Sequence, residues 1–225
     1  MSKDKKIQSL IKKELKSENS KEKYLNILDH RIDDNRKSIG KLFLILLITA
    51  IAFPLLTDTK ISEISIGPLK IIDSKTALSL IPTIFTFTYY KYLMIWFDLV
   101  EQKRTFELLT AELFSLDVKS FLNDRLKPFS ITDSIDKHHS QSKLDSIGCI
   151  TYFFWIPTIF IVILFPFFFE FYLIKKILEV LNPKSILDWL LFITPILIGL
   201  FTILMIIQVI RNDLKKNKNN IQQNI

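Results

Sequence analysis

Four charged residues lie in, or at the ends of, the long apolar stretches of this sequence: Lys91, Asp98, Glu170 and Asp188. A charged group at the centre of a membrane helix costs about 2.5–3.5 kcal/mol, so such residues usually hold protons, bind ions or form ion pairs. Each of the four lies toward the end of its apolar stretch, and we therefore expect all of them near lipid headgroups. The alternative places Lys91 or Glu170 inside a helix bundle, as a pathway residue or an ion-pair partner.

Two groups of residues have side chains that can bind metals, but their spacing is only weakly typical of a metal site. His30 and Asp34 lie four residues apart on a predicted helix and could share one face, beside Asp29 and Asp33. Neighbouring Arg and Lys residues favour the interpretation of a solvated, charged helix face. The adjacent pair at positions 138–139, both histidines, lies in a polar linker with only scattered Asp and Ser around it. We predict no metal site.

The sequence contains no recognisable catalytic motif. H-E-x-x-H, G-x-S-x-G and G-x-x-x-x-G-K-[ST] are all missing, and only four glycines are present. Cys149 is the single cysteine, which excludes a disulfide within one chain and a cysteine metal cluster. We therefore predict a protein that is not an enzyme, with no catalytic residues and no cofactor.

Four apolar blocks alternate with charged ones, which is the pattern of a multi-pass membrane protein. The stretch from Gly148 to Phe169 holds no charged residue. About 20 such residues in a helix cross the hydrocarbon core of a bilayer. The fold class predicted is all-α, with four transmembrane helices. Their ranges are 39–57, 76–100, 147–170 and 186–210.

The segments between these spans divide into two kinds. Residues 1–38 and 101–146 are charged, with amphipathic helices and a Ser-rich linker, and residues 211–225 form a polar tail predicted to be disordered. The connections at 58–75 and 171–185 are short. In the first of them, alternating residues around Gly67-Pro68 suggest a small extracytoplasmic β-hairpin.

Local signals mark several contacts. Ser17 to Ser20 can end one helix and cap the next, and Gly199 would let another helix approach closely. A candidate cytoplasmic contact face follows the second span at helical spacing. It comprises Phe106, Leu109, Leu113 and Leu116.

Charge placement predicts the orientation. Most Lys and Arg residues lie before the first span, in the middle loop and in the tail, so the net charge of +7 follows membrane topology and does not indicate nucleic-acid binding. Both termini are predicted to be cytoplasmic, in a bacterial plasma (inner) membrane.

Three functions remain open at this point. We expect a non-catalytic scaffold or interaction protein in contact with the lipid bilayer, acting as a homo-oligomer or with a protein partner on the cytoplasmic side. The alternative is a small channel, pore-forming effector or transporter subunit. A membrane enzyme acting on lipids is the least favoured.

Overall fold

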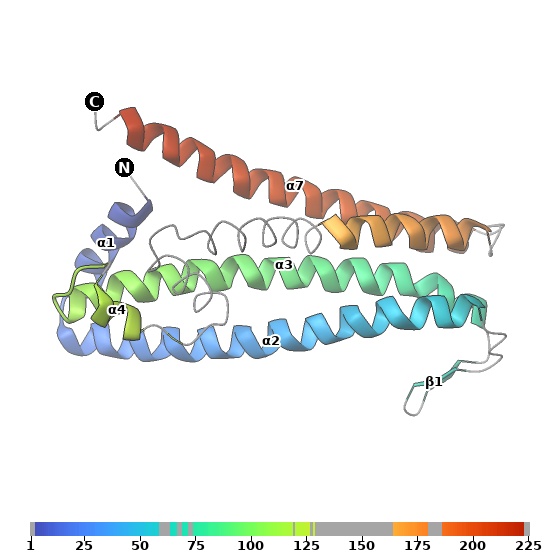
Figure 1. Ribbon diagram of the computed structural model, residues 1–225, viewed down its shortest axis with the longest axis horizontal. Coiled ribbons are helices and arrows are strands. Elements are labelled where there is room, and N and C mark those ends of the chain that lie inside the picture. Colours follow the sequence, from blue (N-terminus) through green and yellow to red (C-terminus); the bar gives the residue numbers. More distant parts are fainter. Residues whose placement is uncertain are drawn as a thin grey trace, which may run out of the picture. The chain divides into compact units, whose positions relative to one another are not determined.

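The computed structural model describes residues 3–58, 64–66, 69–71, 74–118, 120–126, 128, 164–179 and 186–222. The part of the chain that the structure describes is almost entirely helical, as the sequence predicts (Figure 1). The helices are α1 (Lys3–Glu14), α2 (Glu18–Asp58), α3 (Ser74–Leu113), α4 (Phe121–Leu126), a helix at 164–179 and α7 (Ile186–Gln222). The predicted linker beyond residue 130, the third span before residue 164, the paired histidines and Cys149 lie outside the described residues.

The start of α2 is set by a reciprocal cap, which confirms the prediction for this segment. The backbone N–H of Ser20 donates to Ser17 Oγ at 3.2 Å, and the N–H of Ser17 donates to Ser20 Oγ at 3.3 Å. These bonds satisfy donors that a helix start leaves without intrahelical partners. Residues 15–17 separate α1 from α2, and Ser17 is the last of them.

Helix α3 ends at Leu113. Ser115 has φ 53°, a left-handed conformation, and the N–H of Leu116 donates to the carbonyl of Ala111 at 2.8 Å. This arrangement closes the helix end in the manner of a Schellman motif, in which glycine usually takes the left-handed position. Because residue 115 is a serine, the sequence did not contain the glycine that usually marks such a helix end.

Two helices run further than the sequence predicts. The helix at 164–179 continues nine residues beyond the expected end of the third span at residue 170. Helix α7 continues through Gln222, across most of the tail predicted to be disordered. Once a helix is nucleated, each added residue gains a hydrogen bond at small cost, so a long apolar helix extends readily into polar sequence.

Between α2 and α3, β1 (Ile64–Ile66) and β2 (Leu69–Ile71) pair antiparallel, with Ile64 opposite Ile71. Each strand has three residues, which is short for a structure expected to be stable by itself.

The chain forms two compact units. The first comprises Met1–Gly40, Met94–Lys137 and Leu204–Ile225, and the second comprises Lys41–Leu93 and His138–Ile203. Helices α2 and α3 each contribute residues to both units.

The first unit buries two apolar clusters along α3. Leu28 and Ile32 of α2 pack with Leu99 and Phe106 of α3. One turn further along, Ile11 of α1 packs with Leu108 and Leu109. The polar residues on the other faces of α1 and α2 stay exposed, so this unit has the core of a small helical layer.

The second unit is centred on Phe53 of α2, which is fully buried. It packs with Leu78 and Phe85 of α3 and with Leu173 and Ile177 of the helix at 164–179. The ring of Phe169 lies 4.9 Å from that of Phe85 and 6.5 Å from that of Phe53, both edge to face. Aromatic pairs of this geometry add stability beyond their buried area.

Helices α2 and α7 are each long and apolar enough to cross a membrane. Only 11% of the most apolar stretch of α2, and 17% of that of α7, is buried inside the protein. Large side chains such as Ile48, Leu190 and Leu204 are more than half exposed. A core helix of a soluble protein would instead hide most of this surface, because apolar side chains leave water favourably.

Candidate functional site

Glu170 is the charged residue that the fold buries most deeply among the four singled out from the sequence. Its side chain is 7% exposed, in a helix that buries Leu173 and Ile177 on the same side. This helix includes residue 179, so Glu170 lies at least about 13 Å before its end rather than at it. Glu170 is therefore further from the connection between the last two spans than the sequence suggested.

Gly199 of α7 makes room for the Glu170 carboxyl group. A Cβ atom at position 199 would lie 2.7 Å from Glu170 Oε1 and 3.1 Å from Oε2. Separations under 3.0 Å are sterically forbidden, so an alanine would displace the carboxyl group. The sequence suggested that Gly199 would let another helix approach closely, and in the structure the group that occupies this space is the side-chain carboxyl group of Glu170.

Two buried threonines lie on the neighbouring helices, and one of them contacts Glu170. Thr86 of α3 is 1% exposed and hydrogen-bonds with Glu170. The Thr86 hydroxyl also donates to the carbonyl oxygen of Pro82 at 2.7 Å. On α7, the fully buried Thr202 donates to the carbonyl of Ile198 at 2.8 Å. Three helices thus meet at Glu170, and its nearest described polar neighbour is a hydroxyl.

A small cavity lies next to this site, one to two helical turns toward the start of α7. Its lining includes Ser79 and Pro82 of α3, Ile174 of the helix at 164–179, and Asp188 and Pro195 of α7. Each proline lacks an N–H donor and so leaves the carbonyl four residues earlier without its helical partner. The cavity has room for about one water molecule, and its lining is mostly apolar apart from Ser79 and Asp188.

Two aromatic pairs lie about one helical turn from this site along the chain. Tyr89 and Phe167 pack edge to face with ring centroids 5.6 Å apart, and Tyr90 and Phe201 are 5.7 Å apart. Phe167 lies three residues before Glu170 in the same helix, and Tyr90 lies one turn beyond Thr86. Phe201 is 58% exposed, so the second pair lies at the surface of the helices.

Two of the remaining three charged candidates are at the surface. Lys91 is exposed. Asp98 is also exposed, and it accepts hydrogen bonds from Gln102 at 2.7 Å and from Asn35 at 3.1 Å. Asp188 is half-buried at the cavity. The structure therefore brings Glu170 and Asp188 near the same cavity and leaves the other two apart from it.

The predicted contact face is divided by the fold. Phe106 and Leu109 are buried against α2 and α1 of the same chain, while Leu113 and Leu116 are half-buried. Two of the four side chains thus form the core of the first unit. The exposed large apolar residues of this region are instead on and beside α4, and they are Phe114, Phe121, Leu122 and Leu126.

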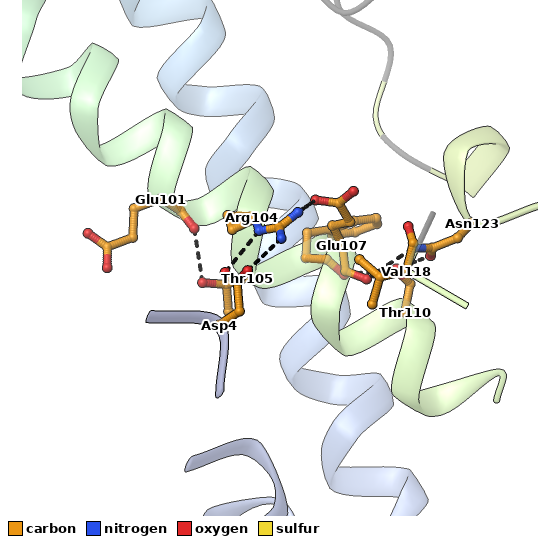
Figure 2. A network of polar contacts seen from close by, with 9 residues as sticks. Asp4, Glu101, Arg104, Thr105, Glu107, Thr110, Val118 and Asn123 are labelled. Atoms are coloured by element: carbon orange, nitrogen blue, oxygen red, sulfur yellow. Dashed lines mark hydrogen bonds and ion pairs between the residues drawn. The ribbon is translucent and has the colours of Figure 1, made fainter. Parts of the chain in front are cut away.

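A polar network fastens α1 and α4 to α3 in the first unit (Figure 2). The Arg104 guanidinium donates from Nε and Nη2 to the two oxygens of Asp4, at 3.1 and 2.7 Å, and it also pairs with Glu107. These hydrogen bonds, that to Asp4 foremost, raise the pKa of Arg104 above its usual value. Nearby, Lys21 of α2 pairs with Glu112 at 2.9 Å, and both side chains are largely buried.

Asn123 is the buried polar residue of α4. Its Nδ2 donates to the carbonyls of Val118 at 3.0 Å and Glu107 at 3.2 Å, and its Oδ1 accepts from Thr110 Oγ1 at 2.7 Å (Figure 2). The side chain is 0% exposed. A lone asparagine in a polar stretch gave no sequence signal for this role.

The histidine and aspartates of α2 do not gather into a metal site. Among the described residues, no three His, Cys, Asp or Glu side chains are grouped so as to hold a metal ion. Asp33 pairs with Lys37 at 2.6 Å, and this hydrogen bond lowers the pKa of Asp33 and raises that of Lys37.

The chain was compared with protein-family models, with curated proteins and with solved structures, and none of them matches it. The argument for function therefore depends on the chemistry of the site and on the exposed surfaces.

Proposed function

We propose that this chain is a multi-pass protein of a bacterial inner membrane, with four spans and both termini in the cytoplasm. The exposed apolar surfaces of α2 and α7 support lipid as the solvent of these helices. The second span would follow α3 from Ser74, and the third would include the helix at 164–179. The basic segments would remain in the cytoplasm, with the paired strands β1 and β2 on the opposite side.

We further propose that its role is non-catalytic, as a scaffold that presents a cytoplasmic helical layer to a protein partner. The observation that carries this proposal is the group of exposed large apolar side chains on and beside α4 in the first unit, which are Phe114, Phe121, Leu122 and Leu126. Exposed apolar residues gathered on an otherwise polar helical layer are typical of a protein contact surface.

Location and orientation can be tested in cells. The protein should stay with the membrane fraction after alkaline washing and leave it only in detergent. A protease added to sealed, right-side-out cells should spare both termini and the loop after α4. Cleavage of that loop from outside, or release by the alkaline wash, would contradict the topology.

The scaffold role can be tested at the exposed apolar residues of α4. Phe121 and Leu122 are 60% and 61% exposed, so replacing both with serine should leave the fold intact while weakening a partner contact. Ile27 of α2, 53% exposed, is a matched control position in the same unit. Photocrosslinking from position 121 should capture a defined protein, and crosslinking from position 27 should not. Equal capture from both positions would argue against a contact at α4.

A second candidate function, a small channel or transporter subunit, is favoured by the buried Glu170 and by a small cavity whose mostly apolar lining includes Ser79 and Asp188. In liposomes, Glu170→Gln should then change ion flux, whereas Lys91→Ala should not, because Lys91 is exposed. Flux that is the same in the wild type and in Glu170→Gln would leave the scaffold role as the better account.

A further inference from the structure

We propose that Lys41 and Lys91 together bind the headgroup of an anionic phospholipid from the inner leaflet of the membrane. This inference rests on the membrane location and the cytoplasmic termini proposed above, and it is independent of the scaffold role. It assigns a chemical partner to two side chains for which the described part of the chain provides none.

Both lysines are exposed, and neither forms a hydrogen bond or an ion pair with any residue that the structure describes. No acidic residue lies three or four positions from Lys41 or Lys91, where a helix would bring a counter-ion close. Lys37, one turn before Lys41 in the same helix, pairs instead with Asp33 at 2.6 Å. The two lysines are therefore free to bind an anion from their surroundings.

The two lysines lie at matching positions along their helices. Lys41 is 17 residues before Asp58, the last residue of α2, and Lys91 is 17 residues after Ser74, the first residue of α3. Each is thus about 26 Å along its helix from the connection proposed to lie on the outer side. The hydrocarbon core is about 30 Å thick. Because a lysine can extend its charged end along apolar surface to the interface, both ammonium groups can reach the inner phosphate layer.

Both lysines also lie on the same side of the helix pair. Phe53, near the end of α2, packs with Phe85, near the start of α3, so these two helices run antiparallel. Lys41 lies 12 residues before Phe53, and Lys91 lies six residues after Phe85. At about 100° per residue, both steps amount to the same rotation along the chain, about 240°. Equal rotations away from a shared core lead to the same side of two antiparallel helices.

Apolar side chains continue this side toward the middle of the membrane. Ile45 and Ile48 lie four and seven residues after the lysine of α2, and Phe87 and Ile84 lie four and seven residues before that of α3. All four are exposed. Residues at these spacings share a helix face with the lysine. The surface therefore presents two cations at the level of the phosphates and apolar side chains at the level of the acyl chains, which matches a phospholipid.

Charge decides which phospholipid fits best. A zwitterionic headgroup brings a positive group of its own beside its phosphate, and this group would face two lysines without a counter-ion. An anionic headgroup brings only the negative charge. A lysine near an anionic membrane surface strengthens binding by about fivefold, so two lysines should favour an anionic over a zwitterionic lipid by about 25-fold.

Native mass spectrometry of the full-length protein in detergent can test this contact. The protein is titrated with phosphatidylglycerol and, separately, with phosphatidylcholine of the same acyl chains, and the dissociation constant of the first bound lipid is measured. The wild type should prefer phosphatidylglycerol by about 25-fold. Lys41→Gln and Lys91→Gln should each reduce this preference to about fivefold, and the double variant should abolish it.

Two controls separate the site from general charge effects. Lys41→Arg and Lys91→Arg keep the positive charge and should retain most of the preference. Lys175→Gln removes an exposed lysine of the helix at 164–179, at a position proposed to lie on the outer side, and should change the preference by less than about twofold.

Equal affinity of the wild type for the two lipids, or a preference that survives in the double glutamine variant, would overturn the inference. So would an equal loss in Lys175→Gln, because any exposed lysine would then have the same effect. The membrane location would stand in all three cases. Release of the protein from membranes by the alkaline wash would instead refute the location itself.

Discussion

Replacing Asn123 with alanine should loosen the attachment of α4 to α3. The side chain makes three hydrogen bonds at 2.7, 3.0 and 3.2 Å, each with a net value of about 1 kcal/mol. Thr110 and the Glu107 carbonyl keep other partners within α3, so their share of the loss is smaller. The Val118 carbonyl would lose its hydrogen bond from Asn123, so the cost of removing this carbonyl from water would no longer be offset. We expect the total to be about 2–3 kcal/mol.

Hydrogen exchange followed by mass spectrometry on the full-length protein in detergent measures this loss directly. A cost of about 2–3 kcal/mol corresponds to roughly 30–150 times faster exchange, in the peptides covering residues 114–126. Asn35→Ala is the matched control, because Asn35 makes hydrogen bonds of 3.1 Å near the surface of the same unit. It should change exchange by less than about fivefold.

The reasoning fails if Asn123→Ala accelerates exchange no more than Asn35→Ala does. In that case the buried amide would be replaced by water without loss, and the network in Figure 2 would contribute little to holding α4.

Three further outcomes follow from single contacts. Gly199→Ala should destabilise the protein by about 1–3 kcal/mol in thermal unfolding, and by much less when Glu170 is also replaced by alanine. Gly40→Ala is the control, because a Cβ atom at position 40 would meet nothing within 4 Å; this change should stabilise the helix by about 0.5–1 kcal/mol. Ser115→Gly should stabilise the end of α3 by about 0.5–1 kcal/mol, seen as slower exchange there, because glycine adopts φ 53° without strain. Arg104→Lys should speed exchange in α1 about two- to fivefold, since lysine cannot form the two-pronged bond and the pair is partly exposed. Unchanged exchange in α1 would show that the pair contributes nothing to its attachment.

The sequence alone determined the features that depend on local pattern. Uncharged apolar runs long enough for a bilayer indicated helices in lipid, because composition and length decide that choice. Ser17 and Ser20 marked the start of α2, since a cap involves residues only three apart. Gly199 indicated that another part of the protein comes close to α7 at this position, because glycine has no side chain to occupy that space.

The partners of these features, in contrast, were decided by tertiary structure. Glu170 meets Thr86 and Gly199, which lie 84 and 29 residues away, and no local period specifies such pairs. Phe106 and Asn123 became core residues because α1, α2 and α4 fold onto α3, whereas the sequence showed only an amphipathic stripe and a polar loop. Burial depends on what the rest of the chain brings to each face, so the depth of Glu170 could be seen only once three helices were assembled around it.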